Sequence, residues 1–255
     1  MNVTTFWAML MRDAHVARRN FMTLAFQVLL QPMLFVFVFG RVMTTSGFMP
    51  PQYKNLLLPG IIALSMVFTG TWAVTMPLIS DFQFTKEIED RLLAPIELEW
   101  LAVEKVVAGM IQTLVAGFVV IPTAWLVMGG VELSTDHVAW FLLLALLVAM
   151  LASTLGLVLG ASVGQQQVGL MFSMVLTPMI FFGCTYYPWQ ALASFPIVKR
   201  LVLVNPLVYA SEGFRSALVP QFPHLPSIAI LGCLAAFDAA FLLFGLRQFK
   251  RKALT

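Results

Sequence analysis

Asp238 is the ionisable side chain that the sequence places well inside a long apolar run, where a carboxyl group can bind a proton or a cation. A proton relay usually needs a chain of ionisable groups in neighbouring helices, and no other predicted span supplies one. We therefore interpret Asp238 as an acid that faces the helix bundle or a subunit contact and is hydrogen-bonded to Ser, Thr or Gln side chains. A proton- or ion-coupled carrier that uses Asp238 stays the alternative.

Motifs of enzymatic chemistry are absent from the sequence. It contains no G-x-x-x-x-G-K-[ST] phosphate-binding loop, and no H-E-x-x-H, C-x-x-C or G-x-S-x-G pattern. The histidines His15, His137 and His224 fall at predicted membrane interfaces and have no evident partners. Cys184 and Cys233 lie in apolar surroundings without metal-site spacing, which indicates buried small residues rather than a disulfide or ligands. We predict no catalytic residue, no metal site and no cofactor bound by this chain.

Charge is concentrated between Ser80 and Lys105, which hold seven of the twelve acidic residues. This stretch separates two uncharged runs, 55–80 and 106–131. Its apolar residues recur at helical spacing and form a stripe: Phe84, Ile88 and Leu92. Pro95 should end that helix. A passive connector does not need an amphipathic helix, so we predict that this loop docks a cytosolic partner.

Composition places the chain in a membrane. Hydrophobic residues make up 60% and charged residues 11%, whereas a soluble domain has about 25% charged residues. The net charge of +3 comes from basic residues beside apolar spans, where the positive-inside rule explains them. We therefore exclude nucleic acid as a partner and expect membrane lipids.

The predicted fold is an all-α polytopic membrane protein with one transmembrane domain over residues 1–255. A helix needs about 20 residues to cross the apolar core of a bilayer. The predicted elements are an interfacial helix at 5–20, six spans at about 20–40, 56–79, 104–128, 138–162, 168–187 and 227–246, and a loop at 80–103. Small residues of the fourth span, among them Gly156 and Gly160, predict close helix packing.

Residues 188–226 are too apolar for an ordinary loop and too often interrupted by proline for a span. A short helical hairpin that dips into the interface fits this pattern, because irregular backbone at that depth must be sheltered by protein. Lys and Arg number ten around the termini and the charged loop and five elsewhere. Both termini and the charged loop are therefore predicted to be cytoplasmic, which six spans satisfy.

Three segments together resemble the type-2 ABC exporter permease family. Residues 86–95, Lys-Glu-Ile-Glu-Asp-Arg-Leu-Leu-Ala-Pro, are similar to its charged cytosolic segment, with Glu89 and Asp90 where Gly-Thr is common. Residues 182–188, Phe-Gly-Cys-Thr-Tyr-Tyr-Pro, resemble its L-S-G-x-x-F-P motif. Residues 205–215 are close to N-P-L-x-Y-x-x-E-x-x-R, which is the most specific match.

The resemblance implies a six-span permease with a coupling helix between spans two and three and an extracellular re-entrant element between spans five and six. It implies a bacterial plasma (inner) membrane subunit that pairs with a second permease copy, as a homodimer or heterodimer, and with two cytosolic ABC ATPase subunits. ATP and Mg would be bound by those partners. The substrate would be amphipathic: a drug, a lipid or a lipo-oligosaccharide, with efflux and antibiotic resistance as the corresponding roles.

The resemblance also assigns residues to roles. The expected coupling residues are Phe84, Lys86, Glu87, Ile88, Glu89, Asp90, Arg91 and Leu92. The expected re-entrant and exit residues are Gly183, Pro188, Asn205, Pro206, Glu212 and Arg215. Three-residue spacing makes Glu212 and Arg215 neighbours on one helical face.

The implied mechanism is conformational. Closure of the two ATPase subunits would move the docked helix and switch the paired permeases from inward to outward access, with no reactive group in this chain. Two other classes stay open: a secondary carrier driven through Asp238, and a membrane scaffold that transports nothing. ATPase activity that co-purifies with the chain would separate the first reading from both.

Overall fold

The computed structural model describes residues 6–7, 9–12, 15, 30, 32–50, 52–83, 98–130 and 133–253. Regular structure in this part of the chain is helical, without strands. The elements are η1 (Val36–Val42), α3 (Met43–Thr45), α4 (Tyr53–Gln83), α6 (Leu98–Met128), α7 (Val138–Ser162), η2 (Gln165–Gln167), α8 (Val168–Phe181), η3 (Trp189–Ser194), α9 (Pro196–Leu201), η4 (Val202–Val204), α10 (Pro206–Leu218) and α11 (Ser227–Ala253).

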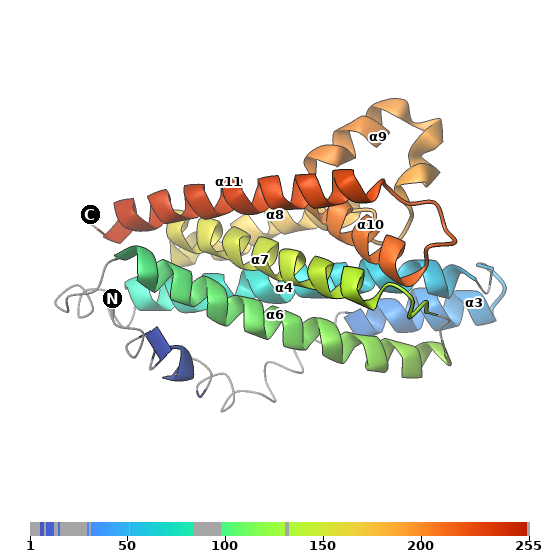
Figure 1. The fold of residues 1–255 in the computed structure, drawn as a ribbon, viewed down its shortest axis with the longest axis horizontal. Coiled ribbons are helices and arrows are strands. Elements are labelled where there is room, and N and C mark those ends of the chain that lie inside the picture. The colour runs from blue at the N-terminus through green and yellow to red at the C-terminus, as the bar shows by residue number, and fades with distance from the viewer. Residues whose placement is uncertain are drawn as a thin grey trace.

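The long helices α4, α6, α7 and α11 run along the longest axis of the molecule (Figure 1). We call the end at which α4, α7 and α11 finish and α6 begins the base. The opposite end, which carries α9 and α10, is the head. The segment that includes α9 projects away from the long helices at the head (Figure 1).

Helix α7 is the centre of the bundle, because it packs against α4, α6, α10 and α11. Its contact with α4 depends on small residues: a Cβ at Gly156 would lie 2.7 Å from the Thr71 carbonyl oxygen. The hydroxyl of Thr75 donates to the Gly156 carbonyl at 3.0 Å. A Cβ at Gly160 would lie 2.9 Å from Leu78. The close packing predicted from the glycines of this helix is thus confirmed.

Four helices in the described part of the chain are long and apolar enough to cross a membrane: Tyr53–Phe82, Leu98–Met128, Val138–Ser162 and Ser227–Ala253. Two shorter apolar helices, Pro32–Thr45 and Val168–Phe181, accompany them. They fall at the predicted first and fifth spans, so the count of six spans stays a prediction. Residues 20–29 of the first predicted span, and most of the predicted interfacial helix 5–20, lie outside the described residues.

The two helices that flank the charged loop extend into the range 80–103 predicted for it. Helix α4 continues to Gln83 and α6 begins at Leu98. An ion pair explains the extension: Lys105 Nζ lies 3.2 Å from Asp81 Oδ2, and both residues are buried. Asp81, predicted in the charged loop, and Lys105, predicted in the third span, therefore join α4 to α6 at the base.

The first and fifth predicted spans also have different ends in the structure. Helix α8 stops at Phe181, six residues before the predicted end, because the chain turns there and Cys184 adopts a φ of 52°. At the other boundary, the helix of the first predicted span continues past Arg41 to Thr45 through a π-helical turn. Arg41 Nη1 donates to the Val127 carbonyl of α6 at 2.9 Å. This hydrogen bond accommodates the Arg41 charge between η1 and α6.

Candidate functional site at the head

A buried ion pair lies at the centre of the head. Glu212 and Arg215 are both 0% exposed and lie three residues apart on α10. Arg215 Nη1 donates to Glu212 Oε1, and its Nη2 donates to the Cys184 carbonyl at 3.0 Å. The guanidinium therefore fastens α10 to the turn that follows α8.

The Glu212 carboxylate binds two further segments. Its Oε1 accepts from the Trp189 amide at 2.9 Å, at the start of η3, and its Oε2 accepts from the Leu225 amide at 3.2 Å, just before α11. Glu212 and Arg215 together thus connect four parts of the chain between residues 184 and 225. Both carboxylate oxygens are satisfied by donors, which is the condition under which a buried charge is tolerated.

The Glu212 carboxylate offsets part of the cost of burying the Arg215 charge. Burial lowers the pKa of Arg215 from its usual value, and the neighbouring Glu212 carboxylate opposes that change. An Arg side chain has so high an unperturbed pKa that it stays protonated at neutral pH. Loss of either partner would leave the other as an uncompensated buried charge.

Asn205 and Pro206 start α10. The Asn205 Oδ1 accepts from the Leu207 amide at 3.0 Å, which is N-capping geometry, and Pro206 occupies the first helical turn, where no amide donor is needed. The Asn205 Nδ2 also donates to the Met179 carbonyl at 2.7 Å. Asn205 therefore caps α10 and ties its start to the last turn of α8.

Gly183 and Pro188 bracket the turn after α8. A Cβ at Gly183 would lie 2.6 Å from both the Leu207 side chain and the Met179 carbonyl, so only glycine fits between α8 and α10. Pro188 precedes η3 in extended conformation. All six exit residues expected from the sequence consequently lie in one continuous structure around the start of α10.

Helix α4 supplies contacts that the sequence analysis missed. A Cβ at Gly60 would lie 1.9 Å from the Thr185 carbonyl oxygen, so the turn after α8 rests directly on the α4 backbone. The Tyr53 hydroxyl donates to the Tyr186 carbonyl at 2.8 Å. A glycine inside an apolar span signals a close approach, but its partner cannot be read from the sequence; the Tyr53 contact has no sequence signal.

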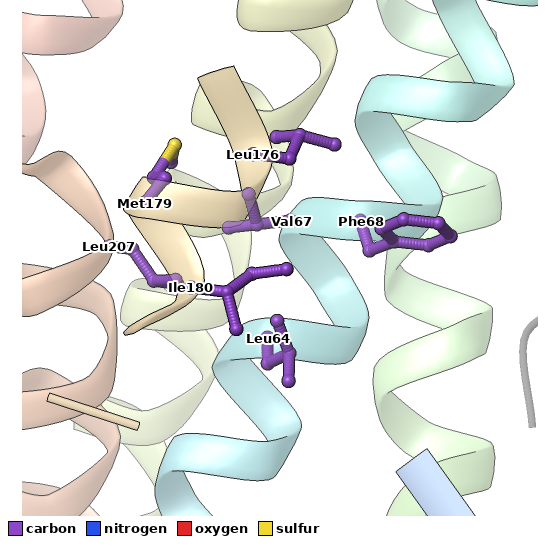
Figure 2. A pocket seen from close by; sticks show the side chains of 7 residues that line it. All are labelled: Leu64, Val67, Phe68, Leu176, Met179, Ile180 and Leu207. Carbon is purple, nitrogen blue, oxygen red and sulfur yellow. The ribbon is translucent and has the colours of Figure 1, made fainter. Parts of the chain in front are cut away.

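An apolar pocket lies next to this site, toward the middle of the bundle. Figure 2 shows a small pocket between α4, α8 and α10, with only apolar side chains in its lining. The lining residues are Leu64, Val67, Phe68, Leu176, Met179, Ile180 and Leu207. No lining side chain offers a hydrogen bond, so the pocket suits apolar matter rather than an ion or water.

Asp238 lies apart from the head, in the middle of α11. It is 2% exposed, and neither carboxylate oxygen has a hydrogen-bond partner among the described residues. The hydrogen bonds to Ser, Thr or Gln expected from the sequence are thus not formed in the described part of the chain. Within that part, no group of three or more His, Cys, Asp or Glu side chains is placed to hold a metal ion.

The expected coupling residues, Phe84 to Leu92, lie outside the described residues. The structure describes only the helix ends on either side of them, at Gln83 and Leu98. Both cysteines are free thiols: Cys184 is buried and Cys233 is half-buried. Both were predicted to be buried small residues, which is confirmed for Cys184 and not for Cys233.

Comparison with known proteins agrees with these features. A family model described as "ABC-2 type transporter" matches residues 4–219. A relative called "Inner membrane transport permease YadH", from Escherichia coli strain K12, is 26% identical over 234 residues, which cover 88% of each chain. A relative with the same name from Shigella flexneri matches equally, at 26% identity over 234 residues.

Proposed function

This chain belongs to the ABC-2 type transporter family, and from that premise we propose that it is the permease subunit of an ATP-driven exporter. ATP and Mg bind to a separate cytosolic ATPase subunit, present in two copies. A second permease copy, identical or related, completes the transporter. The relative's name, an inner membrane transport permease, supports a bacterial plasma membrane location. The distribution of Lys and Arg supports a cytoplasmic base and cytoplasmic termini.

The observation that carries this proposal is the Glu212 network. It joins the turn after α8, η3, α10 and the start of α11 through one buried carboxylate and its Arg215 partner. Such a structure moves as one body or not at all, because separating its parts would expose an unpaired charge to an apolar interior. We assign it the role of a rigid outer gate between the fifth and sixth spans.

The base is where movement of the ATPase subunits is passed to this chain. The segment that follows α4 and precedes α6 docks on the ATPase subunit, with Phe84, Ile88 and Leu92 as its apolar anchors. The buried Asp81–Lys105 pair keeps the two helix ends together as that segment moves. Helices α4 and α7 then carry the displacement to the head, since small residues pack them closely.

The substrate proposed is amphipathic. Phe68 and Trp72 stack at 6.2 Å between ring centroids, and Phe172 meets Trp72 edge-on at 4.9 Å. Phe68 and Trp72 are only partly buried, so their rings offer an apolar surface, and Phe68 also lines the pocket of Figure 2. Rings of this kind accept oily molecules of varied shape, which suits a drug, a lipid or a lipo-oligosaccharide.

The test is co-purification. The tagged chain, extracted in detergent, should recover an ABC ATPase subunit, and the complex should hydrolyse ATP. The chain alone should hydrolyse none above a mock preparation, because it has no phosphate-binding loop. Hydrolysis by the isolated chain would overturn this division of roles.

A second candidate function, an ion- or proton-coupled carrier, is favoured by Asp238. Its two carboxylate oxygens lack hydrogen-bond partners among the described residues, and a buried acid of that kind is suited to binding a proton or a cation. Transport by the chain without the ATPase subunit, driven by a proton gradient and abolished in Asp238→Asn, would establish this candidate instead.

A further inference from the structure

The last two turns of α11 contact the other three long helices at the base. The Phe249 ring lies 5.4 Å from the Phe82 ring, at the end of α4. Lys250 forms an ion pair with Glu99, in the first turn of α6. Lys252 reaches the end of α7. The end of α11 therefore touches both helix ends that flank residues 84–97 and also the helix at the centre of the bundle.

Lys252 caps the end of α7. Its Nζ donates to the Gly160 carbonyl at 3.1 Å and to the Val163 carbonyl at 2.9 Å. The last carbonyls of a helix have no partner within the helix, and they carry a partial negative charge that an ammonium group stabilises. The same Nζ lies 4.8 Å from the centroid of the Phe82 ring, in cation–π geometry. Lys252 thus joins α7, α11 and α4.

The contacts that α11 makes at the base differ in strength because they differ in burial. Phe249 is 0% exposed, so its ring is an anchor within the base. The side chains of Lys250 and Glu99 are 45% and 53% exposed, and exposed ion pairs hold two elements together only weakly. Phe249 and Lys252, rather than the Lys250–Glu99 pair, therefore fix the position of α11 at the base.

We propose that the last two turns of α11 clamp the ends of α4, α6 and α7, so that motion of the segment at 84–97 reaches α7. Lys252 is a positioning residue in this clamp, because it holds α7, the helix that must follow the coupling segment. The coupling part of this inference rests on the proposed function. The clamp itself is a property of the chain alone and is testable without the partner.

The clamp is measured by the distance between spin labels on α7 and α11. Ser162 and Phe244 are exposed label positions on these helices, and both native cysteines are replaced by alanine. The full chain in detergent should give a narrow distance distribution, and Lys252→Met should broaden it. Lys252→Arg should restore the narrow distribution, because a guanidinium also donates to carbonyls. Arg247→Met, which removes an equal charge from an exposed position on the same helix, should have no effect.

Coupling is measured on the complex with its ATPase subunit, in vesicles of phosphatidylethanolamine and phosphatidylglycerol. Lys252→Met should leave the ATPase bound but lower ATP hydrolysis by at least about fivefold, the lower limit of ordinary coupling between sites. Lys252→Arg and Arg247→Met should stay within about twofold of the unaltered complex, as surface substitutions do. Normal ATP hydrolysis with Lys252→Arg would show that Lys252→Met acts through the lost positioning of α7 and not through a general loss of folding.

Each outcome decides one part of the inference. An unchanged distance distribution in Lys252→Met would overturn the clamp. A broadened distribution with unchanged ATP hydrolysis would overturn its role in coupling. Failure of the unaltered chain to bind any ATPase subunit would overturn the proposed function and the coupling role with it, and the label distances would still decide the clamp.

Discussion

Glu212→Ala tests the buried network at the head. The substitution leaves the Arg215 guanidinium without its counter-ion in a site where both residues are 0% exposed. It also removes the acceptor from two backbone amides, those of Trp189 and Leu225. Breaking a buried ion pair by removing one partner costs about 3–5 kcal/mol, and each unsatisfied amide adds about 1–3 kcal/mol if water cannot reach it. We expect the free energy of unfolding to fall by at least about 3 kcal/mol.

The assay is denaturant or thermal unfolding of the purified chain in detergent. Glu99→Ala is the matched control, because Glu99 also forms an ion pair with a basic residue but its side chain is 53% exposed. Its removal should cost about 0–1 kcal/mol. The double variant Glu212→Gln with Arg215→Met, which removes both charges and keeps similar volumes, should be more stable than Glu212→Ala. Equal stability of Glu212→Ala and Glu99→Ala would refute the reasoning.

Further substitutions test the remaining contacts. Asn205→Ala should destabilise the chain by about 1 kcal/mol through loss of a helix cap, measured as a lower melting temperature in detergent. Gly60→Ala should cost about 1–3 kcal/mol by overpacking, whereas Gly169→Ala, which faces open space, should not lower the melting temperature. Asp238→Asn should retain ATP-dependent transport in vesicles, and loss of transport with assembly intact would favour the carrier. Ile88→Asp should abolish recovery of the ATPase subunit in a pull-down, because it places a carboxylate in the docking contact; undiminished recovery would remove the coupling role of that segment.

The helices could be predicted from the sequence because long uncharged runs have few other stable structures in a membrane. The predicted fourth span, 138–162, and helix α7 have the same bounds. The ends of other helices could not be predicted. Asp81 was assigned to the charged loop at 80–103, and Lys105 to the start of the span at 104–128. Only the structure shows that Asp81 lies within α4 and pairs with Lys105 across two helices.

The head was predictable in part. The spacing of Glu212 and Arg215 predicted their proximity, since residues three apart share a helical face. Their other partners are backbone groups of Cys184, Trp189 and Leu225, which lie 13 to 31 residues away in sequence. Backbone amides and carbonyls occur at nearly every residue, so no pattern of residue types distinguishes those that a buried side chain will bind.

Transport by this chain should be driven by the ATP that its partner subunit hydrolyses. The complex of this chain with its ATPase subunit is reconstituted in vesicles, and movement of a fluorescent amphipathic dye is followed. We expect dye movement that needs both subunits and ATP, continues when the proton gradient is collapsed, and stops when the ATPase subunit is omitted. Dye movement by this chain alone, driven by a proton gradient and indifferent to ATP, would contradict this expectation.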